Sequence, residues 1–179
     1  MTSMLYNGRP ETDEGREARE IMVYDFLDNL GISYQRVDHE PVATMEDCLA
    51  VERVLGTAIC KNLFLTNRQH TAFYLLLMPG DKPFRTKDLS AEIGTARLSF
   101  AAPEEMERML GTSPGSASVL GLMCDREREV TLLVDRALLS AERIGAHPLV
   151  NTASLSLSLS DITDIFLPAV GHTMQRVTL

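Results

Sequence analysis

The chain has 179 residues, 45% of them hydrophobic, which is enough for one substantial core and too short for two ordinary domains. Its net charge of -8 argues against a protein that coats long nucleic acids, because phosphate binding depends on lysine and arginine. The opening residues MTSMLYNGRPETDEG lack a basic start followed by an apolar run, and no apolar segment reaches membrane-spanning length. We therefore expect a cytoplasmic protein with no membrane partner.

The charge is unevenly distributed along the chain. Residues 1–60 carry 5 basic and 12 acidic side chains, residues 61–97 carry 6 and 3, and residues 98–179 carry 6 and 10. The middle segment is thus locally positive, which suits a limited contact with an anionic end better than a long duplex. From charge alone, a solvated surface explains the same residues. They are Lys61, Arg68, Lys82, Arg85, Lys87 and Arg97.

The cysteines and most histidines do not indicate a metal site. Three cysteines, an odd number, have neither CxxC spacing nor nearby histidines, so we interpret them as free thiols. Three histidines are isolated in the sequence, and a surface or core position explains each better than metal ligation. We expect no metal and no cofactor. The residues concerned are Cys48, Cys60, Cys124, His39, His70 and His172.

In the first half of the chain, apolar residues at helical spacing predict a helix over 14–30, which Gly31 ends. Alternation predicts a strand in ISYQRVDH, and Thr44 with Asp47 resembles a capping box that opens a helix to about Leu55. Two further strands are expected over 58–65 and 71–78, joined by a hairpin turn in TNRQH.

The second half mixes helices with strands. Helices are expected over 86–93, 103–111 and 160–171, strands in ARLSFA, over 129–134, around 142–146 and in ASLSLSLS, and a loop in GTSPGSAS. Because hairpins alternate with helices, this order favours an α+β fold, a single domain with a central mixed, mostly antiparallel sheet and surrounding helices. We assign residues 14–179 to this domain and residues 1–13 to an N-terminal tail.

The run AICKNLFL, residues 58–65, places two polar side chains in a strand whose two faces are otherwise apolar. Lys61 shares a face with Ile59 and Leu63, and Asn62 shares the opposite face with Phe64. Lysine is rarely buried without a partner, so this placement indicates a functional site. The alternative is a strand end where the lysine side chain reaches back to water.

The run GAHPLVNTAS is the second candidate site. Pro148 restricts His147 to an extended or turn conformation, and Asn151 and Thr152 stand just before a strand. Taken alone, the same residues are explained by a turn.

A hydrolase triad is the competing motif, because GTSPG matches the GxSxG nucleophile elbow and Asp135 and His147 follow in the right order. The elbow needs a strand before the serine and an N–H after it, whereas a helix precedes Ser113 and Pro114 has no N–H. Cys60 beside Lys61 is not an activated thiol either, because successive strand residues point to opposite faces. A conventional serine or thiol hydrolase is therefore disfavoured.

Six segments together resemble a known family. CKNLFL, a strand like TAFYLLLM, RLSFAAPEEME, LGTSPGSAS, an LLVD strand and AHPLVNTAS occur in this order between about Leu30 and Gly171. In this combination the chain resembles the stand-alone prolyl-tRNA editing proteins, which are related to the editing insertion of bacterial prolyl-tRNA synthetase. KNLFL and HPLVNT at this separation are the most specific parts of the resemblance.

The resemblance implies a single α+β domain that hydrolyses the ester of mischarged alanyl-tRNA(Pro), an aminoacyl-tRNA deacylase without cofactor. The implied partner is the acceptor end of tRNA(Pro) carrying a small amino acid, and prolyl-tRNA synthetase is a second partner that the sequence leaves open. The family's lysine and histidine match Lys61 and His147, which we assign as catalytic residues. The substrate-binding residues that we assign are Asn62, Gly115, Ser116, Ala117, Ser118, Val119, Asn151 and Thr152.

One position departs from the family pattern. The family loop typically closes GxxxP, whereas residues 115–119 read GSASV, and Val119 neither fixes φ nor removes an N–H. The amino-acid preference is therefore open, with cysteinyl- or seryl-tRNA as alternative substrates. A catalytically silent homologue that binds tRNA or a synthetase is the alternative from another class.

Overall fold

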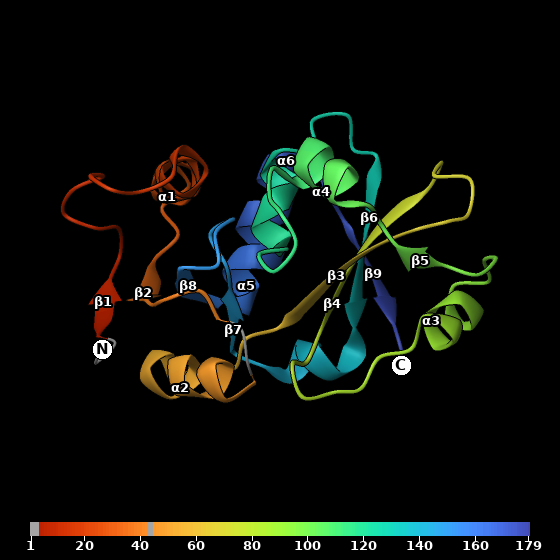
Figure 1. Ribbon diagram of the computed structural model, residues 1–179, viewed down its shortest axis with the longest axis horizontal. Coiled ribbons are helices and arrows are strands. Elements are labelled where there is room, and N and C mark those ends of the chain that lie inside the picture. The colour runs from red at the N-terminus through yellow and green to blue at the C-terminus, as the bar shows by residue number, and fades with distance from the viewer. Residues whose placement is uncertain (1–3, 43–44) are drawn as a thin grey trace.

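The computed structural model describes residues 4–42 and 45–179, without the side chain of Met45, and its strands form two sheets (Figure 1). In the first sheet every neighbouring pair of strands is antiparallel. Its strands, in spatial order, are β1 (Leu5–Asn7), β2 (Tyr34–Asp38), β8 (Ala153–Ser158) and β7 (Arg143–Ala146).

The second sheet is mixed. Its strands, in spatial order, are β5 (Ser99–Phe100), β3 (Lys61–Thr66), β4 (Phe73–Met78), β6 (Val130–Asp135) and β9 (Met174–Val177). β5, β3 and β4 pair antiparallel, whereas β4 with β6 and β6 with β9 pair parallel. The predicted α+β class and the mostly antiparallel mixed pairing are confirmed, and the strands divide between two sheets.

Helices surround these sheets. They are α1 (Ala18–Asn29), α2 (Met45–Leu55), α3 (Thr86–Glu92), α4 (Pro103–Leu110), the short turns η1 (Val119–Met123) and η2 (Arg136–Ser140), and a last helical run of α5 (Leu159–Asp161), η3 (Ile162–Phe166) and α6 (Leu167–Val170). The predicted cap residue Thr44 lies outside the described residues. Within residues 4–42 and 45–179, no helix is both long and apolar enough to cross a membrane.

The core lies on both faces of β3. Phe64 packs into the large cluster between the two sheets, together with Leu75 and Leu77 of β4. Leu65 points the other way, into a smaller cluster that Leu89 of α3 covers. The part of AICKNLFL from Lys61 onward is therefore a strand covered on both sides, as the sequence predicts.

β8 shows the same alternation with a polar face. Leu155 and Leu157 are buried in the large cluster, and the serines that alternate with them face the other side. Ser156 is within 2.6 Å of the Thr57 hydroxyl, and Ser154 is 2.9 Å from His39 Nε2. These hydrogen bonds satisfy buried hydroxyls that would otherwise destabilise the fold.

The segment assigned as an N-terminal tail makes ordered contacts. β1 pairs with β2, and Arg36 of β2 donates to the carbonyl of Gly8 at 2.7 Å. The Arg36 guanidinium also lies over the Tyr6 ring, 4.8 Å from its centroid. Arg9 forms an ion pair with Asp25 of α1 at 2.7 Å.

The two sheets join at one backbone crossing. The N–H of Cys60 donates to the Gly145 carbonyl at 3.0 Å, and the N–H of Gly145 donates to the Ala58 carbonyl at 2.8 Å. A Cβ on Gly145 would stand 2.8 Å from the Ala58 oxygen, so only glycine fits this approach. The strand expected over 58–65 consequently begins at Lys61, because residues 58–60 are occupied by the crossing to β7.

Candidate functional site

Lys61 is the first residue of β3, just past the crossing between the sheets. Its side chain is partly buried, and Nζ donates to the carbonyl oxygen of Lys82 at 2.5 Å. Lys82 itself pairs with the buried carboxylate of Asp135 at 2.6 Å. Among the described residues no carboxylate lies within ion-pair distance of Lys61, so its charge remains available to an anion.

Asn62 is held by its own neighbour. Its Nδ2 donates to the Cys60 carbonyl at 3.2 Å, which fixes the amide plane. Its Oδ1 is buried, and no donor within the described part of the chain reaches it. A buried acceptor without a donor is costly, and it is the kind of group that a bound ligand satisfies.

His147 follows β7, two residues beyond the glycine of the crossing. Its Nδ1 lies 3.0 Å from the Ala153 carbonyl, and since a carbonyl only accepts, Nδ1 carries the proton and Nε2 is the basic nitrogen. Burial lowers the pKa of His147 below its ordinary value, the bond to Ala153 raises it in part, and neighbouring His39 lowers it further. The imidazole is therefore neutral at neutral pH.

The loop that contains Gly115 is tied to the turn after His147. Thr112 Oγ1 contacts the Ser116 hydroxyl at 2.7 Å and donates to the Leu149 carbonyl at 3.0 Å. Leu149 has a φ of 63°, a conformation uncommon for a branched side chain, and it carries this carbonyl toward the loop. A Cβ on Gly115 would stand 3.9 Å from Asn151 Nδ2, so the two predicted substrate-binding residues are neighbours.

The far end of this loop is fixed by a helical turn. Ser118 Oγ accepts from the N–H of Leu120 at 3.2 Å, and Val119 is fully buried as the first residue of η1. Ala117 is partly buried against the core. The N–H of Ser116 donates to the Ser113 carbonyl at 3.1 Å, so it is already used and cannot also serve as a donor to substrate.

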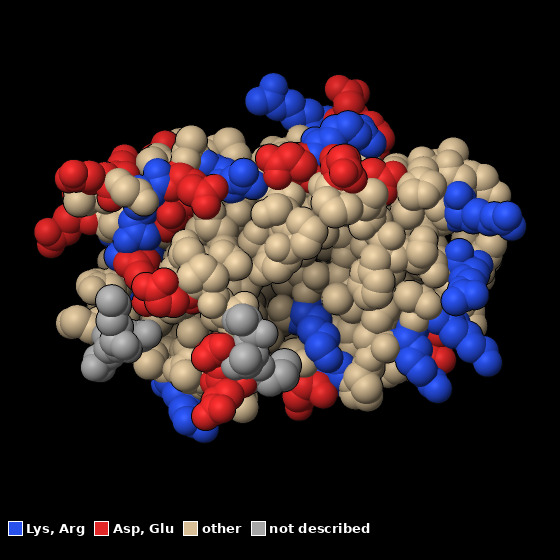
Figure 2. Space-filling view, viewed as in Figure 1, with Lys and Arg blue, Asp and Glu red and all other residues tan. Residues whose placement is uncertain are grey.

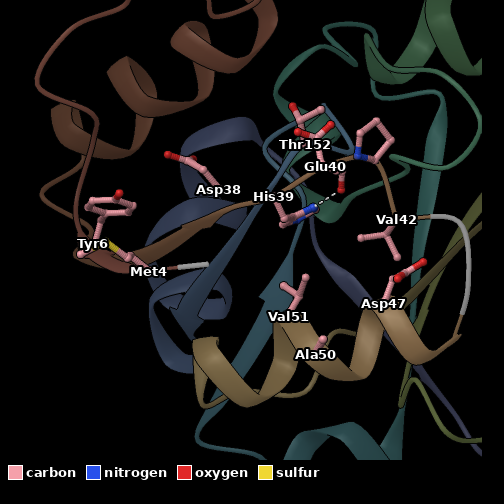
Figure 3. A pocket seen from close by; sticks show the side chains of 11 residues that line it. Met4, Tyr6, Asp38, His39, Glu40, Val42, Asp47, Ala50, Val51 and Thr152 are labelled. Atoms are coloured by element: carbon pink, nitrogen blue, oxygen red, sulfur yellow. Dashed lines mark hydrogen bonds between the residues drawn. The ribbon is translucent and has the colours of Figure 1, made fainter. Parts of the chain in front are cut away.

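Thr152 lies elsewhere, in a pocket of about 500 Å³ between the end of β2 and α2 (Figure 3). Its carbonyl accepts from the N–H of His39 at 2.9 Å. Figure 3 shows His39 in the middle of the pocket, with Ala50 and Val51 of α2 facing it. His39 Nδ1 donates to the Glu40 carbonyl at 2.8 Å, so Nε2 accepts from Ser154.

The predicted site residues thus form three groups: Lys61 with Asn62, the 115–119 loop with Asn151, and His147 with His39, which lines the pocket of Thr152. The backbone crossing aligns Ile59 with Gly145 in a parallel bridge, which puts Lys61 and His147 each two residues past a paired position. In the described ranges no hydrogen bond joins these two side chains directly.

The alternative triad is absent from this geometry. Asp135 is 1% exposed and is bound to Lys82 and to the N–H of Ala137, whereas His147 Nδ1 is bound to the Ala153 carbonyl. Burial raises the pKa of the Cys60 thiol to about 12, so it is a protonated core side chain at neutral pH. Neither Ser113 nor Cys60 has the surroundings of an activated nucleophile.

Comparison with known proteins identifies the family. A family model described as "Aminoacyl-tRNA editing domain" matches residues 39–165, and the prolyl-tRNA editing protein ProX of Acetoanaerobium sticklandii is 31% identical over 86% of this chain and 93% of its own. The chain belongs to the aminoacyl-tRNA editing domain family. The expected enzyme class, an aminoacyl-tRNA deacylase, is thereby confirmed.

Two other known proteins are similar to this chain over comparable lengths. Prolyl-tRNA synthetase associated domain-containing protein 1 of Mus musculus is 32% identical over 82% of this chain and 88% of its own. A crystal structure described as that of a candidate trans-editing enzyme for prolyl-tRNA synthetase superimposes with a TM-score of 0.66, at 16% identity, over 91% of this chain and 98% of its own. The latter similarity concerns the fold of the editing domain.

Two residues of this editing domain were missed from the sequence. Thr112 belongs to GTSPG, a motif that only resembles a nucleophile elbow, and its role depends on Leu149, which follows much later in the chain. His39 is isolated in the sequence, yet its ring lies 6.3 Å from that of His147. Only its position two residues after the inward-facing Val37 of β2 could have indicated that it points to the same side.

Proposed function

We propose that this protein is a trans-editing hydrolase that removes alanine from mischarged alanyl-tRNA(Pro), with Lys61 and His147 as its catalytic residues and Asn62 beside them in the substrate site. The names of its relatives, which mention prolyl-tRNA editing and prolyl-tRNA synthetase, support proline tRNA as the nucleic acid. The observation that carries the location of the site is the Lys61 ammonium, which is held by the Lys82 carbonyl and has no carboxylate partner among the described residues.

In this proposal the ammonium of Lys61 holds a phosphate at the 3′ end of the tRNA. Asn62, on the opposite face of β3, fixes the backbone beside Lys61 through its bond to the Cys60 carbonyl. The contact from Lys61 positions an ester that is already activated, so no covalent nucleophile is required.

The reaction is hydrolysis by a positioned water. The water oxygen bonds to the ester carbonyl carbon, the bond from that carbon to the ribose oxygen breaks, and a proton from the water reaches the ribose oxygen. Neutral His147 orients the water through Nε2. Gly115, in the exposed part of its loop, is the candidate N–H donor to the developing oxyanion, since the N–H of Ser116 is engaged.

Selection for alanine follows from size. A synthetase pocket built for proline cannot strongly reject a smaller side chain, because the lost apolar contact is worth only about 1 to 3 kcal/mol. A second, smaller site therefore removes alanine and excludes proline. Val119 in place of the family's proline leaves serine and cysteine as the alternative small substrates.

A deacylation panel tests the proposal. Alanyl-, seryl-, cysteinyl- and prolyl-tRNA(Pro) are incubated with submicromolar enzyme, with Lys61→Met as the matched control. Loss of alanyl-tRNA with survival of prolyl-tRNA supports the proposal. Equal or faster loss of prolyl-tRNA refutes it, and absence of turnover on all four substrates favours the silent homologue that only binds.

A further inference from the structure

The positive segment 61–97 contains two kinds of basic residue. Lys82 and Arg85 are neutralised by Asp135 and Asp88, at 2.6 and 2.8 Å. Lys87 and Arg97 instead line one pocket of about 400 Å³ at α3, and within the described residues neither has a carboxylate partner. Figure 2 shows basic side chains gathered at the end of the molecule that carries α3 in Figure 1, whereas acidic side chains crowd the opposite end.

An aromatic pair stands beside these cations. Phe100, on the edge strand β5, is 59% exposed, which is unusual for so large an apolar side chain. The ring of Phe84 meets it edge-on, with the centroids 6.3 Å apart, and Phe84 packs on the core cluster that α3 covers. Phe84 therefore supports a ring whose outer surface is left to a ligand.

The chain connects the aromatic pair to Lys61 by two routes. The residue whose carbonyl binds Lys61, Lys82, lies two positions before Phe84, in the connection from β4 to α3. β5 pairs with β3 at Leu65, four residues beyond Lys61, so Phe100 lies about 13 Å along the strand from it. We call the set Lys61, Phe84, Lys87, Arg97 and Phe100 the basic strip.

A nucleic acid is the occupant that fits this strip. In a nucleic-acid site, exposed aromatic rings stack on bases while cations between them bind phosphates. A protein partner with an acidic surface would use the cations but would not require the exposed rings. Charges along one strand of a duplex recur about every 3.4 Å, so the strip is long enough to meet more than one phosphate. The net negative charge of the remaining surface would keep the nucleic acid to this face.

We infer that the acceptor arm of the tRNA runs along the basic strip as it leaves the catalytic centre, with Lys87 and Arg97 on its phosphates and Phe100 stacked on an exposed base. The inference rests on the proposed function in that the substrate is a tRNA. It adds the path of that tRNA across the surface, from β3 toward α3.

The test compares two double variants of equal net charge. Lys87→Ala with Arg97→Ala removes two cations of the strip, and Arg126→Ala with Arg176→Ala removes two exposed cations elsewhere, one of them on β9 at the opposite edge of the same sheet. Binding of an uncharged tRNA(Pro) transcript is measured by fluorescence anisotropy at several salt concentrations. Deacylation is measured on alanyl-tRNA and on the alanyl ester of adenosine.

We expect the strip variant to raise Kd at least tenfold and to reduce the slope of log K against log salt by about 2. Its preference for alanyl-tRNA over alanyl-adenosine should fall at least tenfold, and the control pair should change Kd less than twofold. Phe100→Leu should weaken binding while leaving the salt slope unchanged, because stacking carries no charge.

Equal Kd values for the strip and control variants would overturn the inference. If the wild-type protein deacylates no substrate but the strip variant loses tRNA binding, the result supports the strip and refutes the proposed function. If the wild-type protein is active but the strip variant binds tRNA as tightly as wild type, the result supports the proposed function and refutes the strip.

Discussion

The imidazole rings of His39 and His147 meet at a steep angle, 62° between their planes, with centroids 6.3 Å apart. Ser154 of β8 lies between them, 2.9 Å from His39 Nε2 and 3.5 Å from His147 Nδ1. Each histidine follows a strand that flanks β8, and the sheet brings them together. The nearby His39 ring lowers the pKa of the His147 imidazole, in addition to the lowering by burial.

The first prediction concerns pH. Because the pKa of His147 is lowered in the folded protein, the unfolded chain binds more protons below the ordinary histidine pKa of about 6.5, and stability falls as pH falls through that window. We expect the unfolding free energy, measured by urea denaturation, to fall more between pH 7.5 and pH 5.5 in wild type than in His147→Gln. Identical losses in the two proteins would contradict the burial argument.

Activity should fall with pH in the same direction as stability. A neutral His147 that orients water should keep kcat constant as pH falls to about 6.5 and lose it below, with an apparent pKa under the ordinary value. His147→Gln should abolish this acid limb. A rate that rises on acidification would show that the protonated ring is the active form.

The second prediction concerns the tie between the loop and the turn. Thr112→Val keeps the side-chain shape and removes a hydroxyl that contacts Ser116 and Leu149, leaving a buried carbonyl without its donor. We expect a loss of about 1 to 3 kcal/mol in unfolding free energy and a lower kcat. Thr112→Ser, which keeps the hydroxyl, is the control and should recover both. Full activity of the valine variant would show that the tie does not position Gly115.

How much of this was predictable depends on whether the signal is local. The alternation in ASLSLSLS and the αL glycine that ends α4 are local, and the strand and the helix end were both predicted from them. The start of β3 was not, because Gly145, far along the chain, takes the pairing positions of residues 58–60. Thr112 and His39 were missed for the same reason, since their partners are distant in sequence.

The third prediction concerns residues 1–13, which the sequence assigned to a tail. Their deletion should uncover the edge of β2 and leave Arg36, 3% exposed, without the Gly8 carbonyl and the Tyr6 ring. We expect a lower Tm, because the lost contacts cost about 1 to 3 kcal/mol of unfolding free energy. The value of kcat should be retained at a temperature where the truncation stays folded. Tyr6→Leu should lose only the ring contact, so its Tm should lie between that of wild type and that of the truncation. A folded truncation without turnover would place the segment in the site.

The fourth prediction concerns Val119. Ser118 is extended, with φ -152° and ψ 145°, which suits the residue before a proline, and Val119 is the first residue of η1, where a proline N–H would not be needed. Val119→Pro should therefore fold and sharpen discrimination among alanine, serine and cysteine. Val119→Ala, which loses packing without fixing φ, is the control. Unchanged relative rates in both variants would exclude the loop as the source of preference.

The last prediction separates two neighbouring lysines. Lys61→Met removes one bond to the Lys82 carbonyl from a partly buried side chain, so stability should change by no more than about 1 kcal/mol, whereas deacylation should fall roughly 10²-fold. Lys61→Arg should not restore the rate, because the planar guanidinium is bulkier than a compact ammonium. Lys82→Met is the matched control: it leaves the buried Asp135 carboxylate unpaired and should cost about 3 kcal/mol. A stable, fully active Lys61→Met variant would remove this lysine from the mechanism and leave His147 and the loop to account for turnover.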